Sequence, residues 1–398
     1  MMIYLDNQHS AIVKLNKYKV GALFMEPGTG KSRIAVELAE SAHTDAIIWF
    51  APFGSINNSE GIVKEVKKWA SKPFTFFAIE SFSNSDRLYL EVLELVQSKN
   101  CFLVLDESLK VKNWEAKRTK RLIKISGYCE YKLILNGTPL SKNILDLWAQ
   151  MEFLSPRILS MSLTKFKNTF CEYTTVSKKI GNSYLKKEWI NKYHNIDYLY
   201  ALIQNYVFES KLNLVIQQKW ETIDFQICDD EFLKYTWLKD TYLDNEVLEI
   251  KNNNIFLEMA TKMQHVYAVS DQKFQKIDSI ILKHGIENIV VFTKFVLSKS
   301  TLCIKYPNLM VLSYQKESMS LNLQSKHVTV FFEYTWDYAT VEQAVHRTFR
   351  NGQNNHCFFY RLKSNTGLDA MIEKNISNKK SMLDYLRFTS TNQLKKDL

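Results

Sequence analysis

The sequence predicts an α/β protein with two parallel sheets flanked by helices and a helical insert between them. Three observations carry this prediction: short apolar runs alternate with amphipathic stretches, long Lys-rich and Tyr-rich stretches follow, and short apolar runs then return. Short apolar runs between helical segments are typical of strands buried on both faces of a parallel sheet. The predicted domains are 1–154, 155–285 and 286–398, the last with a C-terminal helix.

Length and composition set the class of protein. A chain of 398 residues is too long for one ordinary hydrophobic core, and 46% hydrophobic with 24% charged residues is typical of a soluble globular protein. No apolar run approaches the roughly 18 residues of a membrane span, so we expect a cytoplasmic protein without a membrane partner. The six cysteines form no C-x-x-C pair, and the excess of 52 basic over 42 acidic residues favours a polyanionic partner.

Two groups of apolar runs define the predicted sheets. The runs of the first sheet are Val20–Phe24, Ala46–Phe50, Phe74–Ile79, Cys101–Leu105 and Tyr131–Leu135. The runs of the second sheet are Ile289–Phe292, Leu309–Leu312, Val328–Phe332 and Cys357–Leu362. The stretch between the two groups is predicted to be mostly helical, with one strand-like segment at Trp220–Phe225.

A phosphate-binding loop follows the first apolar run. Residues 25–32 read M-E-P-G-T-G-K-S and precede a helix-forming stretch, which is the strand, loop and helix order that such a loop needs. Lys31 can neutralise β- and γ-phosphate oxygens, and the Ser32 hydroxyl can bind Mg²⁺. The strict pattern G-x-x-x-x-G-K-[ST] fails only at its first position, where Met25 stands. The residues expected to hold the nucleoside triphosphate are Gly28, Thr29, Gly30, Lys31 and Ser32.

Two carboxylates follow the fourth apolar run. Asp106 and Glu107 come directly after Cys101–Leu105, at the edge of an open α/β sheet where ligands bind. Asp106 can hold Mg²⁺, while Glu107 can polarise the water that attacks the γ-phosphate. The pair therefore complements the phosphate-binding loop.

A helix with two arginines is predicted near the C-terminal part of the chain. Asp337 can cap its N-terminus, and Gly352 can end it. Gln343, Arg347 and Arg350 fall at i, i+4 and i+7, so we expect them to share one helix face. Arginines on a solvated helix are usually surface charge, and only the motif around them favours a catalytic role.

Several segments resemble the motifs of the SNF2 family of superfamily 2 helicase-like ATPases. Residues 343–353 resemble the motif VI pattern Q-A-x-x-R-x-H-R-x-G-Q, residues 106–113 resemble D-E-A-H-R-L-K-N, and residues 135–148 resemble T-G-T-P-L-Q-N-N-L-E-E-L-W. Residues 49–52 stand where motif Ia would be, and residues 290–293 stand where motif IV would be. The motifs occur in order over nearly the whole chain.

The resemblance implies two RecA-like lobes that close over ATP and Mg²⁺. It places Gln8 near the adenine and brings Arg347 and Arg350, with Gln343, from the second lobe to the nucleotide. It further implies an ATP-dependent motor that translocates on or remodels DNA, duplex or single-stranded, with Lys and Arg contacts mainly to phosphates. The positions expected to face nucleic acid are Pro52 to Ser55, Lys142, Asn143, Thr293 and Lys294.

The chain also departs from the family pattern. Leu109 and Phe349 stand where the family has His, and the R-R-x-K signature appears only as residues 208–211. The family's G-L-N-L appears as residues 320–323, and little chain separates Phe292 from Leu312. These features indicate a minimal member of a size associated with phage or mobile-element genes. A role in DNA replication or recombination, with a protein of that process as partner, is therefore expected.

Two rival interpretations stay open. One keeps the enzyme and changes the substrate, as in a strand-separating or RNA-directed helicase of superfamily 2. The other is a pair of lobes that binds DNA or a replication protein as a scaffold with little turnover. The presence of Lys31, Asp106, Glu107, Arg347 and Arg350 argues against the scaffold.

Overall fold

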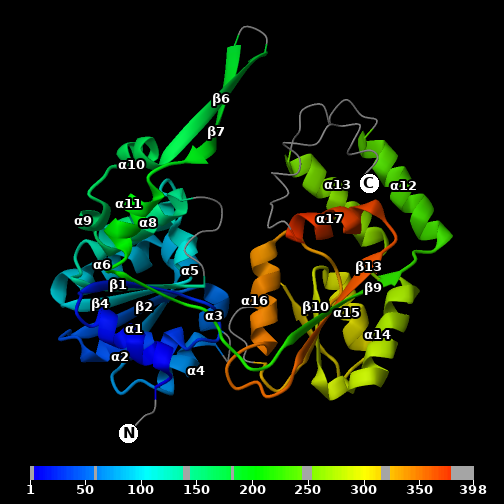
Figure 1. The fold of residues 1–398 in the computed structure, drawn as a ribbon, viewed down its shortest axis with the longest axis horizontal. Helices are drawn as coiled ribbons and strands as arrows, with labels where there is room; N and C mark the ends of the chain where they lie inside the picture. Colours follow the sequence, from blue (N-terminus) through cyan, green and yellow to red (C-terminus); the bar gives the residue numbers. More distant parts are fainter. Residues whose placement is uncertain are drawn as a thin grey trace. The chain divides into compact units, whose positions relative to one another are not determined.

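The computed structural model describes residues 4–57, 61–137, 144–180, 183–243, 253–314 and 323–377. The chain divides into two compact units, Met1–Leu212 and Asn213–Leu398, which are drawn in Figure 1 and described separately below. Each unit contains one parallel sheet flanked by helices, as the sequence predicts. The stretch 155–285 is shared between the two units, and its assignment to a separate insert stays a prediction.

Unit 1 is built on a six-stranded sheet with the order β3-β2-β4-β5-β1-β8. Every neighbouring pair in this sheet is parallel. The strands are β1 (Val20–Met25), β2 (Ala46–Ala51), β3 (Phe74–Ala78), β4 (Cys101–Asp106), β5 (Tyr131–Asn136) and β8 (Val207–Ser210). The five predicted runs are confirmed, and β8 adds an edge strand that was not predicted.

Helices cover both faces of this sheet. Successive residues of β1 contribute to different clusters: Leu23 and Met25 pack with α1, α2 and α4, whereas Ala22 and Phe24 pack with the helices of the opposite face. This alternation explains why the strand is apolar throughout. The helices are α1 (Asp6–Leu15), α2 (Lys31–Ser41), α3 (Phe53–Ile56), α4 (Ile62–Lys67), α5 (Ile79–Asn84), α6 (Asp86–Ser98), α7 (Lys117–Ser126), α8 (Leu145–Leu154), α9 (Pro156–Leu159), α10 (Leu163–Phe170) and α11 (Ile196–Ile203).

A β-hairpin replaces part of the predicted helical insert. Strands β6 (Cys171–Ile180) and β7 (Ser183–Tyr193) form a separate antiparallel two-stranded sheet in unit 1. The expectation of helices throughout 155–285, apart from Trp220–Phe225, was therefore too simple. The β-branched and aromatic residues of the two runs favour strands, and the Gly-Asn pair between them is a hairpin signal.

Unit 2 is built on a five-stranded parallel sheet with the order β11-β10-β12-β13-β9. The strands are β9 (Gln218–Phe225), β10 (Ile289–Thr293), β11 (Met310–Ser313), β12 (Val328–Phe331) and β13 (Cys357–Ser364). The helices are α12 (Asp229–Leu243), α13 (Asn253–Val266), α14 (Asp271–His284), α15 (Val296–Lys305), α16 (Tyr338–Thr348) and α17 (Gly367–Ser377). One core cluster joins Val291 and Val330 of the sheet to Phe256, Met263 and Ile277 of α13 and α14.

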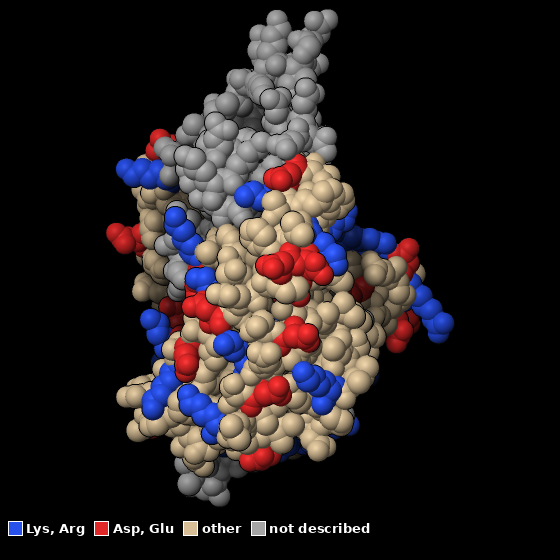
Figure 2. Space-filling view, turned by 90° about the vertical axis from the view of Figure 1, so that its right-hand side faces the viewer, with Lys and Arg blue, Asp and Glu red and all other residues tan. Residues whose placement is uncertain are grey.

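The surface charge is mixed on the face drawn in Figure 2. Basic and acidic side chains are interspersed there, and no broad patch of one sign stands out among the residues shown in colour. Among the described residues, no helix is long and apolar enough to cross a membrane.

Candidate functional site

The phosphate-binding loop has the backbone that a polyphosphate cradle requires. Gly28 and Gly30 have φ values of 86° and 88°, in the left-handed region that glycine adopts at little cost. Between them, the Thr29 hydroxyl donates to the carbonyl oxygen of Glu26 at 2.7 Å and is buried inside the turn. Helix α2 begins at Lys31, so the N-terminal end of its dipole lies directly behind the loop.

The two side chains expected to contact phosphate and metal start this helix. Lys31 Nζ donates to the carbonyl oxygen of Met25 at 2.5 Å and to that of Glu26 at 3.3 Å. The ammonium group therefore lies over the loop itself, where a β- or γ-phosphate would be bound. Ser32 is the next residue of α2 and is partly exposed.

Gln8 packs against the same loop. Its Nε2 lies 3.5 Å from the carbonyl oxygen of Thr29, and its Oε1 accepts a hydrogen bond from the N–H of Leu5 at 3.1 Å. A Cβ atom at Gly30 would lie 2.0 Å from Gln8 Nε2, so the Gln8 side chain would have to move to accept any other residue there. The structure thus places Gln8 beside the loop, while its contact with an adenine stays a prediction.

Asp106 and Glu107 lie at the same edge of the sheet as the loop. Strand β5 separates β4 from β1, and the carboxyl ends of all three parallel strands meet at this edge. A Cβ atom at Gly137, after β5, would lie 3.5 Å from Pro27, so the end of β5 lies beside the loop. The predicted carboxylates and the predicted loop are therefore brought together within unit 1.

Glu107 has an unusual backbone. Its φ of 52° falls in the left-handed region, and its N–H donates to Oδ1 of Asp106 at 3.0 Å. The next residue, Ser108, is fully buried and donates from its hydroxyl to Oε1 of Gln150 in α8 at 2.5 Å. Gln150 thus contacts the residue next to Glu107, and nothing in its local sequence marks a contact with a residue 42 positions away.

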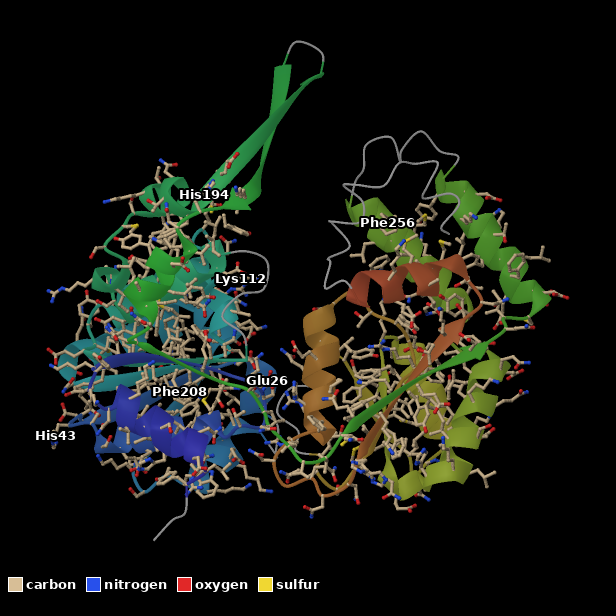
Figure 3. All side chains as sticks on the ribbon, in the orientation of Figure 1. Glu26, His43, Lys112, His194, Phe208 and Phe256 are labelled. Atoms are coloured by element: carbon tan, nitrogen blue, oxygen red, sulfur yellow. The ribbon has the colours of Figure 1, made fainter. Side chains whose placement is uncertain are left out.

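The end of β8 holds the phosphate-binding loop from the other side. The N–H of Glu26 donates to the carbonyl oxygen of Ser210 at 3.0 Å, and Glu26 Oε2 accepts from the N–H of Leu212 at 2.8 Å. Figure 3 labels Glu26 in the loop and Phe208 in β8. Residues 208–211, a poor match to the family's R-R-x-K signature, thus take part in supporting the loop through their backbone.

The residues present suit a nucleoside triphosphate with Mg²⁺. Mg²⁺ is usually bound by one or two protein oxygens together with substrate phosphates and water. In keeping with this, no group of three His, Cys, Asp or Glu residues among the described residues could hold a metal ion by itself. Ser32 and Asp106 would hold the metal, and the loop with Lys31 would hold the phosphates.

The motif VI segment belongs to unit 2. Asp337 caps α16 as predicted. Its Oδ1 accepts a hydrogen bond from the N–H of Thr340 at 3.4 Å, and its Oδ2 accepts one from the Thr340 hydroxyl at 2.7 Å. The helix ends at Thr348, however, and Arg350 lies two residues beyond this end. Gln343 and Arg347 therefore lie on one helix face, as predicted. The prediction that Arg350 shares this face is wrong, because Arg350 lies outside the helix.

The residues that follow α16 explain this early end. Gly352, the predicted stop, has a φ of 90°. Gln353 Nε2 donates to the carbonyl oxygens of Gln324 at 3.0 Å and Lys326 at 2.8 Å, so these contacts hold the chain just beyond the helix. Phe349, which replaces the family's His, is buried. The roles of Gln343, Arg347 and Arg350 toward a nucleotide stay predictions.

Several positions predicted to face nucleic acid are buried. Pro52 is buried and Ser55 is only 5% exposed, because α3 begins directly after Pro52, whereas the neighbouring Phe53 is 52% exposed. Thr293 has no exposed surface, and its hydroxyl contacts the carbonyl oxygen of Leu312 at 3.4 Å. Their side chains are therefore unsuited to a nucleic-acid surface in this conformation. Lys142 and Asn143 lie outside the described residues.

Lys294 is turned into unit 2 by a buried polar network. Its N–H donates to Glu333 Oε2 at 2.8 Å, and its Nζ donates to Gln264 Oε1 at 2.6 Å. Burial lowers the pKa of Lys294 to about 8. Lys273 Nζ lies 3.5 Å from Glu333 Oε1, and both side chains are almost fully buried. Lys294 thus contacts Gln264 of α13 and Glu333 rather than presenting an exposed phosphate contact.

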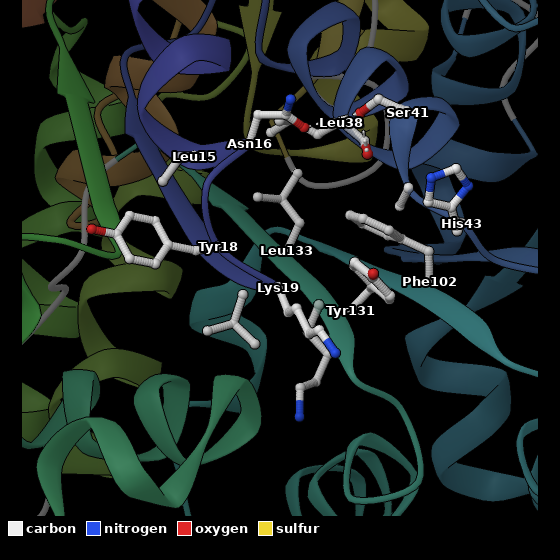
Figure 4. Close-up of a pocket in the computed structure, with 14 residues that line it drawn as sticks. Leu15, Asn16, Tyr18, Lys19, Leu38, Ser41, His43, Phe102, Tyr131 and Leu133 are labelled. Carbon is white, nitrogen blue, oxygen red and sulfur yellow. Dashed lines mark hydrogen bonds between the residues drawn. The ribbon is translucent and has the colours of Figure 1, made fainter.

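A cavity of about 260 Å³ lies elsewhere in unit 1. It is lined by the ends of α1 and α2 and by the starts of β1 and β5, with the ring of Phe102 from β4 (Figure 4). Its rim includes His43, which Figure 3 shows on the opposite side of unit 1 from Glu26. The cavity is therefore at the amino edge of the sheet, away from the phosphate-binding loop.

Comparison with known proteins supports the interpretation of the motifs. The chain is 30% identical over 187 residues to the TATA-binding protein-associated factor mot1 of Schizosaccharomyces pombe. This alignment covers 46% of this chain and 9% of that protein. It is 22% identical over 371 residues to an uncharacterized ATP-dependent helicase of Mycoplasma genitalium. This alignment covers 81% of this chain and 34% of that protein. The chain thus spans a minor part of these relatives.

One solved structure and one family complete the comparison. The Sulfolobus solfataricus SWI2/SNF2 ATPase core in complex with dsDNA aligns with 99% of this chain and 97% of that chain, at 16% identity and a TM-score of 0.43. The SNF2-related domain family matches residues 77–305, which is more than half of the chain and includes Asp106 and Glu107. The chain therefore belongs to the SNF2-related domain family.

Proposed function

We propose that this chain is an ATP-dependent motor of SNF2 type, which hydrolyses ATP with Mg²⁺ and uses the energy to move along duplex DNA. The observation that carries the proposal is the meeting of the phosphate-binding loop and the Asp106-Glu107 pair at one edge of the unit 1 sheet. Family membership and the relative named as an ATP-dependent helicase support the same chemistry.

The residues of unit 1 divide the work of hydrolysis. The N–H groups at the start of α2 and the Lys31 ammonium would bind the phosphates, and Ser32 and Asp106 would hold Mg²⁺. Bound Mg²⁺ neutralises charge on the β- and γ-oxygens. Glu107 would orient the attacking water and accept its proton. Its backbone has a φ of 52°, and the next residue, Ser108, makes a buried hydrogen bond to Gln150.

Unit 2 would supply positive charge to the transition state. We assign this role to Arg347 and Arg350, since a guanidinium can bridge two phosphate oxygens and stabilises charge that grows during phosphoryl transfer. Gln343 lies one turn before Arg347 on α16 and would position the same segment. The support for this assignment is the motif VI sequence.

Strand separation is the second candidate function. It is favoured by the name of the Mycoplasma genitalium relative, an ATP-dependent helicase. The process that the motor serves, which the sequence suggests to be phage DNA replication or recombination with a protein partner, stays a prediction.

Translocation tests the proposal directly. A duplex carrying a short third strand in its major groove is incubated with the protein, Mg²⁺ and ATP, and release of the third strand is followed over time. We expect release with ATP and none with a non-hydrolysable analogue or with Glu107→Gln. A forked duplex measures strand separation in parallel. If the protein separates the fork but does not release the third strand, the helicase is favoured. If it binds DNA but shows neither activity, the scaffold is favoured.

A further inference from the structure

Glu26 holds the phosphate-binding loop through its backbone carbonyl. That oxygen accepts from the Thr29 hydroxyl at 2.7 Å, from the Thr29 N–H at 3.4 Å and from Lys31 Nζ at 3.3 Å. Lys31 is also the residue expected to bind the β- and γ-phosphates, and charged phosphate oxygens compete for an ammonium better than a neutral carbonyl oxygen does. Phosphate binding would therefore withdraw one of the donors that restrain the Glu26 backbone.

The side chain of Glu26 holds the end of unit 1. Its Oε2 accepts from the N–H of Leu212 at 2.8 Å, and its own N–H donates to the carbonyl oxygen of Ser210 at 3.0 Å. Leu212 is the last residue of unit 1, and the chain passes into unit 2 at this point. Glu26, labelled in Figure 3, is thus bonded both to the phosphate-binding loop and to the chain that leaves unit 1.

Residues 211–217, the linker, run from β8 to β9 without helix or strand. Leu212 binds Glu26 near one end of the linker. At the other end, the N–H of Gln217 donates to Nδ1 of His356 in unit 2 at 3.0 Å. Val215, between these two contacts, is fully exposed. A change in the bond to Glu26 therefore acts on the end of the linker that belongs to unit 1.

We propose that Glu26 is a positioning residue that transmits the occupancy of the phosphate-binding loop to the linker. When phosphates bind, Lys31 Nζ leaves the Glu26 carbonyl, Glu26 is restrained less, and its carboxylate holds the Leu212 N–H less firmly. The linker is then released at its unit 1 end while nucleotide is bound. This inference rests on the proposed function, because it gives the ATP site of the motor a route to the chain that enters unit 2.

Two pairs of variants test this bond, one pair from each side. Glu26→Ala removes the acceptor, whereas Glu26→Gln keeps a side-chain oxygen with the same reach. Leu212→Pro removes the donor and leaves the loop sequence unchanged, whereas Val215→Pro places a proline at a fully exposed position of the linker. Glu40→Ala is a further control. Glu40 Oε1 accepts from the N–H of Lys72 at 2.9 Å, next to β3, which is the edge strand opposite β8.

The first measurement is hydrogen exchange of the linker amides, with and without Mg²⁺ and a saturating non-hydrolysable ATP analogue. In the parent, Glu26→Gln and Glu40→Ala, the analogue should speed exchange at least about threefold, as expected for the loss of one hydrogen bond. In Glu26→Ala, exchange should be fast from the start and should not change with the analogue. A parent whose linker exchange does not rise, or a Glu26→Ala variant that responds like the parent, would overturn the inference.

The second measurement is the number of ATP molecules hydrolysed per third strand released, because a merely structural defect of the loop would slow both processes together. Glu26→Ala and Leu212→Pro should raise this number about tenfold, the usual scale of coupling between two sites. Glu26→Gln, Glu40→Ala and Val215→Pro should stay within about threefold of the parent. Equal numbers for Leu212→Pro and Val215→Pro would overturn the inference. A parent that releases no third strand, although its linker responds to the analogue, would instead contradict the proposed function.

Discussion

The N–H of Glu107 donates to Oδ1 of Asp106 at 3.0 Å while Glu107 itself has a φ of 52°. A left-handed backbone costs a non-glycine residue about 1–2 kcal/mol, and strain of this kind persists where neighbouring contacts enforce it, often at active sites. Two hydrogen bonds lie next to this backbone. The Lys110 N–H donates to the carbonyl oxygen of Glu107 at 2.9 Å, and the buried Ser108 hydroxyl donates to Gln150. The two carboxylates are therefore fixed as one unit at the end of β4.

Glu107→Gln should separate ATP binding from hydrolysis. The variant keeps Lys31 and Asp106, so its ATP affinity should match the parent, but it lacks a base for water and should hydrolyse ATP on the order of 10²–10⁴ times more slowly. Nucleotide binding and single-turnover hydrolysis are measured on the same samples, with the exposed Glu115→Gln as control. Hydrolysis by Glu107→Gln at the parental rate would mean that another residue is the base.

The backbone of Glu107 makes a prediction about stability. Glu107→Gly and Glu107→Ala both remove the carboxylate, but only Gly relieves the left-handed strain. We expect the Gly variant to be more stable than the Ala variant by about 1 kcal/mol, with both variants inactive. Chemical denaturation of the two variants measures this difference. If the Ala variant is as stable as the Gly variant, the backbone of Glu107 is not strained in solution.

Gly30→Ala should damage the phosphate-binding loop in two separable ways. The new Cβ would lie 2.0 Å from Gln8 Nε2, and the residue would keep a φ of 88° that alanine disfavours. We expect ATP binding to weaken by about tenfold or more, and the double variant with Gln8→Ala to bind ATP more weakly than Gln8→Ala alone, since the strain remains. Gly127→Ala, at a position with a φ of −63°, is the control. A double variant that binds ATP as well as Gln8→Ala alone would show that contact with Gln8 is the only constraint.

Arg347→Ala and Arg350→Ala should each leave ATP affinity within about tenfold of the parent and lower turnover by about 10³–10⁵. Lysine should not restore turnover, because an ammonium lacks the planar fork of a guanidinium. Arg361→Ala, which removes an arginine stacked on Trp220 at 4.3 Å in the same unit, is the control. Single-turnover hydrolysis within about threefold of the parent would remove motif VI from the catalytic account.

Strand positions were predictable because burial on both faces makes a strand apolar throughout. The run Cys101–Leu105 became β4, and Tyr131–Leu135 became β5, each with one polar residue added at the carboxyl end. Strand β8 was missed because it has only four residues at a sheet edge, where a strong apolar pattern is not required. The β6–β7 hairpin was missed because a Lys-rich and Tyr-rich stretch also suits a solvated helix.

The candidate site was predictable where a motif fixes both sequence and backbone. The loop around Gly28 and Gly30 and the position of Asp106 after β4 follow from local sequence. The buried contact of Ser108, the next residue after Glu107, with Gln150 instead joins residues 42 positions apart. The inward turn of Lys294 likewise depends on Gln264 and Glu333, which are far from it in sequence.

The rate of ATP hydrolysis with and without duplex DNA tests the central claim most directly. The proposed motor should hydrolyse ATP only with Mg²⁺, and duplex DNA should raise its rate more than single-stranded DNA or RNA does. The stimulation should weaken as salt rises, since binding through phosphate contacts releases counterions. A rate that stays the same with every nucleic acid tested would contradict the account and leave an ATPase without a nucleic-acid track.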